Sequence, residues 1–139
     1  MQPERVSAFV AIGRGLRHRC ARCGASGILR DRFHLREHCP RCGYRFVREA
    51  GAFTGVMLLN LVATLGPLFL VLIAYALVRG SGRAVSIWPF ALGCLAIAVV
   101  VPIVFYATAS STWAAIDLVS RPLDPDEELE ALDHQPPDT

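Results

Sequence analysis

Four cysteines in two Cys-x-x-Cys pairs are the residues whose types and spacing predict chemistry. The first pair is Cys20 and Cys23, the second is Cys39 and Cys42, and a glycine follows each pair. Two such pairs, separated by fifteen residues, are typical of a four-thiolate metal site. Each pair forms a tight turn whose two sulfurs converge on one ion. We therefore predict that these four cysteines bind a metal ion.

Zinc is the metal that this ligand set favours, because four thiolates in a closed tetrahedron describe a structural zinc site. Iron is the alternative, since the pairs also resemble rubredoxin turns and iron shares the four-sulfur geometry. His18, His34 and His38 are further candidate ligands. Four cysteines already complete a site, so we expect these histidines to be exposed polar residues. The fifth cysteine, Cys94, lies in an apolar run, where a small buried apolar residue is expected.

The charges divide the chain into three parts. Residues 1–49 hold eleven arginines against four acids, a net charge of +7. Residues 50–120 are nearly uncharged, and residues 121–139 hold one arginine against seven acids, a net charge of −6. The overall charge of +2 therefore conceals a basic head, an apolar middle and an acidic tail.

The basic head divides into a lead-in and a metal module. Residues 1–19 contain a short apolar patch that runs into arginines, without the small-residue cleavage site of a signal peptide. We expect this lead-in to lie on the membrane surface. Residues 20–48 have too few apolar side chains to form a core of their own, so a metal must supply much of their folding free energy. We predict a zinc ribbon built of two short β-hairpins.

Two long runs without charge follow the metal module. The run from residue 50 to 78 would extend about 43 Å as a helix, which exceeds the ~30 Å hydrocarbon core of a bilayer. We predict a transmembrane helical hairpin, with helices over residues 54–78 and 86–112 and a short turn over residues 79–83. Trp88 and Trp113 lie near the ends of the second run, as interfacial anchors do.

The arginine count predicts the orientation in the membrane. Arginines are concentrated before the first predicted span, and only Arg79 and Arg83 lie in the turn. The N-terminal side is therefore expected in the cytoplasm, and two spans return the C-terminus there. This predicts a multi-pass protein of the plasma membrane with its cysteines in a reducing compartment, where free thiols rather than disulfides are found.

The acidic tail, residues 121–139, is expected to be disordered by composition. Asp124-Pro125-Asp126-Glu127 nevertheless has the pattern of a helix N-terminus, and a helix of about ten residues there would be marginal alone. Because the tail and the head carry opposite charges on the same membrane face, we hypothesise that the tail folds back on the head.

The order of these features resembles the bacterial domain of unknown function 983 family. The resemblance covers residues 13–118 and includes Gly15-Leu16-Arg17 before the first pair, Cys39-Pro40-Arg41-Cys42-Gly43-Tyr44, the Gly-Ala-Phe approach to the first span and Trp88 at the second. It implies a small zinc-ribbon membrane protein, associated in some members with respiratory oxidase assembly. Ala21 stands where that family usually has proline, and the acidic tail is an extension.

Three classes of function follow from these features. The first is a non-enzymatic membrane protein whose zinc ribbon serves protein interaction or assembly of a membrane complex. The second is binding of an anionic ligand, acidic lipid or nucleic acid, by the arginine-rich head, with specific nucleic-acid binding disfavoured. The third is thiol-based metal transfer or redox chemistry. No catalytic motif indicates an enzyme, and a homodimer would satisfy the free faces of the helical hairpin.

Overall fold

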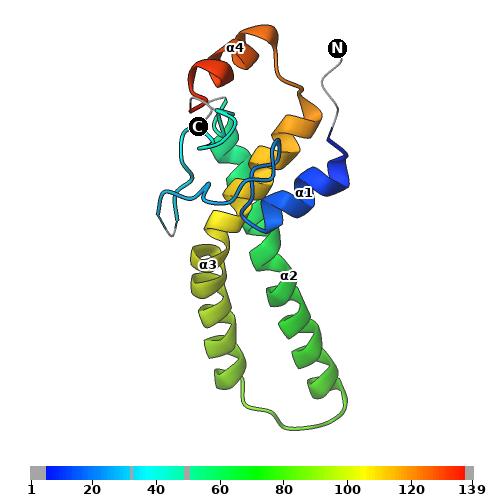
Figure 1. Cartoon of the computed structure of the whole chain (residues 1–139). Helices are drawn as coiled ribbons and strands as arrows, with labels where there is room; N and C mark the ends of the chain where they lie inside the picture. The colour runs from blue at the N-terminus through cyan, green and yellow to red at the C-terminus, as the bar shows by residue number, and fades with distance from the viewer. Residues whose placement is uncertain (1–5, 32, 49–50, 137–139) are drawn as a thin grey trace. The chain divides into compact units, whose positions relative to one another are not determined.

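The computed structural model of the chain describes residues 6–31, 33–48 and 51–136. Its helices, in chain order, are α1 (Ala8–Leu16), α2 (Ala52–Gly80), α3 (Trp88–Ser120) and α4 (Pro125–Asp133) (Figure 1). The chain forms two compact units. We call Met1–Val56 with Ala107–Thr139 the head unit, and Met57–Tyr106 the span unit.

Two helices, α2 and α3, are long and apolar enough to cross a membrane. They have 29 and 33 residues, and the most apolar window of each has a mean hydropathy of 2.5. The predicted bounds of 54–78 and 86–112 differ from those observed: α2 extends from Ala52 to Gly80, and α3 begins two residues later than predicted, at Trp88, and continues to Ser120. The last turns of α3 are rich in alanine and are buried in the head unit. The helix therefore continues past the end of the predicted span.

Within the span unit, polar contact between the two helices is made by Asn60. Its Nδ2 donates a hydrogen bond to the carbonyl oxygen of Pro102 at 3.0 Å, and the Thr64 hydroxyl donates to the Asn60 carbonyl oxygen at 2.8 Å. Nearer the connecting turn, the rings of Tyr75 and Phe90 meet edge to face, 4.5 Å between centroids. A hydrogen bond between helices is the role expected for a polar residue within such an apolar helix.

In the head unit, α1 packs on the last turns of α3 through small residues. A Cβ on Gly15 would lie 2.8 Å from the Ser111 carbonyl oxygen, so the two helices approach more closely than side chains allow. The Ser111 hydroxyl donates to the Gly15 carbonyl oxygen at 2.8 Å, and Ala11 and Ala115 are fully buried beside this contact. This face of α1 is therefore committed to α3, while the side chain of Phe9 is 90% exposed.

Trp113 takes a place that the sequence did not indicate. Its indole lies against Gly55, where a Cβ would collide with the ring. The expected interfacial anchor thus fixes the start of α2 against α3 inside the head unit. Trp88, in contrast, is 73% exposed.

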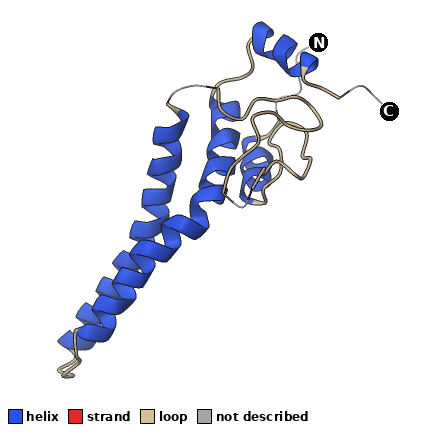
Figure 2. Cartoon of the chain, turned by 90° about the vertical axis from the view of Figure 1, so that its left-hand side faces the viewer, coloured by secondary structure: helices blue, strands red, loops and turns tan. Residues whose placement is uncertain are grey.

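The predicted β-hairpins of residues 20–48 are not confirmed, because the described residues of this segment contain no strand. Figure 2 shows the segment between α1 and α2 as loop. Two isolated antiparallel bridges occur, Leu29 with Leu35 and His38 with Arg45. The chain does reverse direction at both places, but half of the backbone hydrogen bonds among the described residues of this segment close turns around the cysteines, and the others do not extend the bridges into strands.

The expectation of a disordered tail is wrong for residues 125–133, which form α4. Asp124 and Glu127 form a reciprocal capping box, and Pro125 occupies the first turn. These contacts satisfy backbone amides that a short helix would otherwise leave unpaired. Contacts between α4 and the rest of the head unit stabilise it further, because so short a helix is marginal on its own.

Candidate metal centre

The two Cys-x-x-Cys turns have the same backbone hydrogen bonds. The amide of Cys20 donates to the carbonyl oxygen of Ala25 at 2.9 Å, and the amide of Cys39 donates to that of Tyr44 at 2.9 Å. Each following glycine amide then donates back to the first cysteine of its pair, at 2.8 Å for Gly24 and 3.1 Å for Gly43. Both glycines have positive φ, 75° and 65°. The repeated turn explains why each pair needs its glycine.

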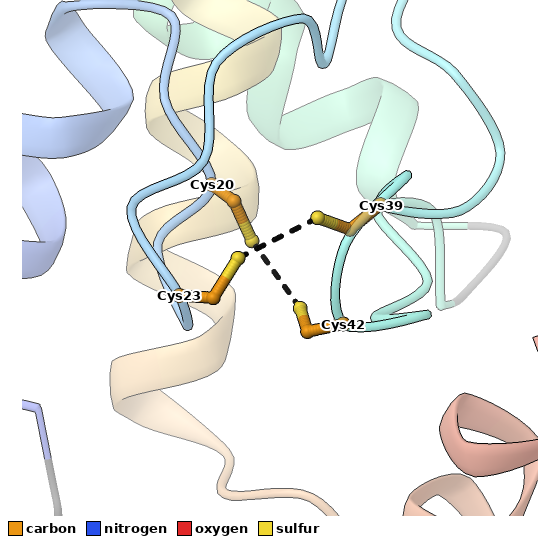
Figure 3. A group of neighbouring side chains, drawn as sticks. All are labelled: Cys20, Cys23, Cys39 and Cys42. Atoms are coloured by element: carbon orange, nitrogen blue, oxygen red, sulfur yellow. Dashed lines mark hydrogen bonds between the residues drawn. The ribbon is translucent and has the colours of Figure 1, made fainter. Parts of the chain in front are cut away.

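The four sulfurs of the cluster all lie within 4.8 Å of one another (Figure 3). Sγ of Cys20 lies 3.8 Å from Sγ of Cys42, and Sγ of Cys23 lies 3.7 Å from Sγ of Cys39. A tetrahedral ion with metal–sulfur bonds of about 2.3 Å places its ligands about 3.8 Å apart. Disulfides would bring them to about 2.05 Å. The four cysteines therefore fit a metal site, which is what their spacing predicted.

The protonation of the cluster depends on the neighbouring thiols. The pKa of Cys39 lies well below its usual range, first because the Cys20 and Cys42 thiols hydrogen-bond to its sulfur, and also because the amides of Arg41 and Cys42 do. The pKa of Cys20 is raised by hydrogen bonding with Cys39 and Cys42 and then by burial. A soft cation at the centre would allow all four cysteines to bind as thiolates.

Side chains of the head unit support both turns from behind. Cys20 and Cys39 are buried in a small apolar core with Ile28, Tyr44 and Phe46. Burial raises the pKa of the Tyr44 phenol, so its hydroxyl stays protonated and donates to the Ala114 carbonyl oxygen of α3 at 3.4 Å. The metal module is therefore seated on α3 through the residue that follows its second turn.

The first turn is held by α1. Nη1 of Arg14, near the C-terminal end of α1, donates to the carbonyl oxygens of Ala21 and Arg22 at 3.1 and 3.2 Å. These are the two residues between Cys20 and Cys23. A guanidinium can serve two carbonyl groups at once because its donors are fixed in one plane.

The second turn is covered by α4. The carbonyl group of Ala131 lies against Gly43, and a Cβ at Gly43 would collide with it. Glu130 faces His38 Nε2 and Arg45 Nη1, each at 3.5 Å, and the ring of His134 stacks on His38 with centroids 3.9 Å apart. The hypothesis that the tail folds back on the head agrees with these contacts.

Arg48 joins the head, α3 and the tail. Its Nε donates to Glu127 Oε1 at 2.8 Å, and its Nη2 pairs with the other oxygen of the same carboxylate. Its Nη1 donates to the Arg121 carbonyl oxygen at 2.7 Å and lies 3.5 Å from Asp117 Oδ2. The side chains of Arg48 and Asp117 are only 9% and 11% exposed. A bidentate pair in this setting fixes geometry as well as charge.

The histidines differ from the expectation that all three are exposed. Only His34 is exposed. His18 is half-buried, with Nε2 3.3 Å from the Thr108 hydroxyl, and His38 is half-buried under α4. Over the described residues, no histidine joins the sulfur cluster, and Cys94 lies in the span unit, outside it.

Arg14, Arg48 and Gly43 contact the elements of this site, and the sequence did not identify them individually. The capping pattern at Asp124 did indicate the helix that Arg48 and Gly43 contact. No local signal indicates which of eleven arginines would pair with it. Such pairing is a property of the folded head unit.

Replacing Gly43 by alanine is expected to displace α4 from the second turn. The new methyl group would strain a backbone with φ of 65° and would also collide with the Ala131 carbonyl group. Gly27→Ala is the matched control, because Gly27 has φ of 80° but nothing within 4 Å of its Cβ position. Positive φ alone costs about 1 kcal/mol. Faster amide exchange of α4 in Gly43→Ala than in Gly27→Ala would show the collision, and equal exchange would contradict it.

Acid is expected to release α4 by protonating Glu127. Hydrogen bonds from Arg48 hold the pKa of this carboxyl below its usual range. Its contribution to stability is therefore complete above the unfolded pKa of about 4.3 and is lost as pH falls through the folded pKa. Asp117 and Arg121 also face this site. Amide exchange of α4, corrected for the intrinsic effect of pH, should accelerate below about pH 4 in the wild type. Glu127→Gln should already exchange fast at neutral pH, and a Glu127→Gln tail that stays as protected there as the wild-type tail would contradict this role.

Comparison of the chain with known protein families, curated proteins and solved structures finds no match. The resemblance to the domain of unknown function 983 family stays a prediction.

Proposed function

We propose that this chain is a non-enzymatic integral membrane protein that presents its cysteine head to a protein partner. The observation that carries the proposal is the position of the sulfur cluster at the centre of the head. Three helices contact its two turns: α1 through Arg14, α3 through Tyr44 and α4 at Gly43. Four thiolates around one ion leave no coordination position for a substrate. The ion therefore serves to hold a surface in shape.

Zinc is the metal we propose for this centre, with iron as the alternative. Sulfur separations of 3.7 and 3.8 Å agree with the zinc–thiolate bond length, and zinc forms closed four-cysteine sites without redox chemistry. Elemental analysis of the purified protein should find one zinc per chain and no visible absorption. One equivalent of iron with a thiolate-to-iron absorption band would replace zinc in this assignment.

The head is proposed to lie in the cytoplasm, at the plasma membrane of a bacterium. The concentration of arginines before α2 supports this orientation, as do four cysteines that form no disulfide. Assembly of a membrane complex, such as a respiratory oxidase, is the process that the family resemblance suggests.

The experiment that tests this function is capture from native membranes in mild detergent. Wild-type protein should retain a stoichiometric protein partner that Cys39→Ser loses. Cys94→Ser is the matched control, because it makes the same chemical change outside the cluster and should retain the partner. Capture that does not depend on Cys39, or that yields no protein, would overturn the proposal.

Binding of an anionic ligand is the second candidate, and exposed arginines favour it. In the described part of the head, five arginines are exposed and form no ion pair: Arg17, Arg19, Arg30, Arg36 and Arg41. Binding to acidic vesicles or to nucleic acid should then weaken steeply with salt, and replacing these arginines by glutamine should reduce the salt dependence. No binding at low salt would end this candidate. Thiol transfer has less support, because Cys20 and Cys39 are buried.

A further inference from the structure

The face of the second cysteine turn is built to receive a helix. Gly43 has no side chain, and the backbone of α4 lies directly on it at Ala131. Beside this contact, His38 and Arg45 lie within ion-pair distance of Glu130, and Arg48 forms an ion pair with Glu127. We call the surface formed by His38, Gly43, Arg45 and Arg48 the knuckle face.

The helix α4, which occupies the knuckle face, buries few of its own side chains there. Ala131 is the single buried residue of α4, whereas Leu129 and Leu132 are each 62% exposed. The attachment is thus mainly electrostatic. The pairs of Glu130 with His38 and Arg45 are partly exposed, and such pairs contribute about 0–1 kcal/mol each, so the more buried pair of Arg48 with Glu127 is the main anchor. A nine-residue helix is also marginal on its own. Such a helix can be exchanged for another that presents the same groups.

We propose that the knuckle face is the docking site for an acidic helix of a protein partner, and that α4 occupies it in the free protein. The recognised pattern is the one that α4 displays: two glutamates three residues apart and a small residue directly after the second. Residues three apart share one helix face, which places both carboxylates over the arginines. The small residue is required because the Ala131 backbone must reach Gly43. This inference rests on the proposed function, since it names the partner class of the same head.

The tether makes α4 a strong competitor for its own site. A segment joined by a short linker acts at an effective concentration on the order of millimolar. A free helix of similar intrinsic affinity therefore does not bind until α4 is weakened. The tail would restrict the head to partners that bind more tightly, or to conditions that release α4.

The test uses the full-length protein and a labelled peptide with the sequence of residues 123–135. Glu127→Gln/Glu130→Gln in the chain removes the carboxylates of its own tail but leaves the knuckle face intact. This variant should bind the unaltered peptide at least about tenfold more tightly than wild type does, because the tethered competitor is weakened. A chain ending at residue 121 is the second variant and should bind at least as well. Raising the salt concentration should weaken binding to both variants.

Two control peptides test the recognised pattern. A peptide with glutamine at the two glutamate positions should lose binding, and so should a peptide with Ala131→Leu, because Ala131 is only 2% exposed and a larger side chain there would hold the helix backbone away from Gly43. The inference is overturned if neither opened chain binds the peptide although amide exchange shows α4 released, or if the leucine peptide binds equally well. Partner capture from membranes is a separate experiment. If the peptide does not bind, the proposed function can still be supported by capture. If capture finds no partner, the peptide experiment still tests the docking site.

Discussion

Replacement of Cys39 by serine is expected to abolish metal binding and unfold residues 20–48. Cys39 is 1% exposed and holds both the sulfur cluster and the apolar core behind it. A hydroxyl is a poor ligand for a soft cation, and structural zinc contributes on the order of 10 kcal/mol to the folding of such a module. The loss should appear as less than one equivalent of metal per chain and as full amide exchange across both turns.

The control for this experiment is Cys94→Ser, which should keep one equivalent of metal and a protected head. Both variants should still insert in membranes, because α2 and α3 do not depend on the cluster for their apolar character. A Cys39→Ser protein that binds metal with unchanged affinity would show that the cluster is not the metal site.

Replacement of Arg48 by leucine is expected to detach α4 and loosen the end of α3. The change removes the bidentate contact with Glu127 and the hydrogen bond to Arg121, and leaves Asp117 buried with one fewer partner. Breaking a buried pair from one side costs about 3–5 kcal/mol. Amide exchange should therefore rise by two or more orders of magnitude over α4 and the last turn of α3.

Two variants sharpen this result. Arg48→Lys keeps the charge but loses the planar fork, so it should retain only part of the protection. Arg41→Leu also removes an arginine of the head, but Arg41 is exposed and has no ion pair among the residues described, so protection should be unchanged. Equal protection in Arg48→Leu and Arg41→Leu would show that Arg48 does not hold the tail.

The cysteine cluster and the two long helices could be predicted from the sequence because both are local signals. Cys-x-x-Cys spacing determines a turn within four residues, and a long apolar run predicts a helix wherever it lies. The extension of α3 to Ser120 could not be predicted from such a signal. Its last turns contain serine, threonine and Asp117, and they stay helical because the head unit covers them.

The strands were predicted as part of a zinc ribbon around the cysteine pairs, and the disordered tail was predicted from composition. In both cases tertiary contacts decided the outcome. Ile28 and Phe46 pack with the buried cysteines, and the described residues near them form isolated bridges and no strand. The tail is acidic enough to be disordered alone, yet Arg48 binds Glu127 from 79 residues earlier in the chain. The sequence predicted attraction between the basic head and the acidic tail, but it did not indicate which residues would form the ion pairs.

The distance along the chain between Tyr44 and its seat on α3 has a consequence for biosynthesis. Both cysteine turns are complete once residue 44 has been made, but Ala114 follows 70 residues later. At roughly 5–20 residues per second, the nascent head waits about 4–14 s for the helix that supports it. During this interval α1 can already hold the first turn through Arg14, but the ion is what joins the first turn to the second. The metal that the cell supplies beside the ribosome is therefore expected to be the one that the finished protein contains.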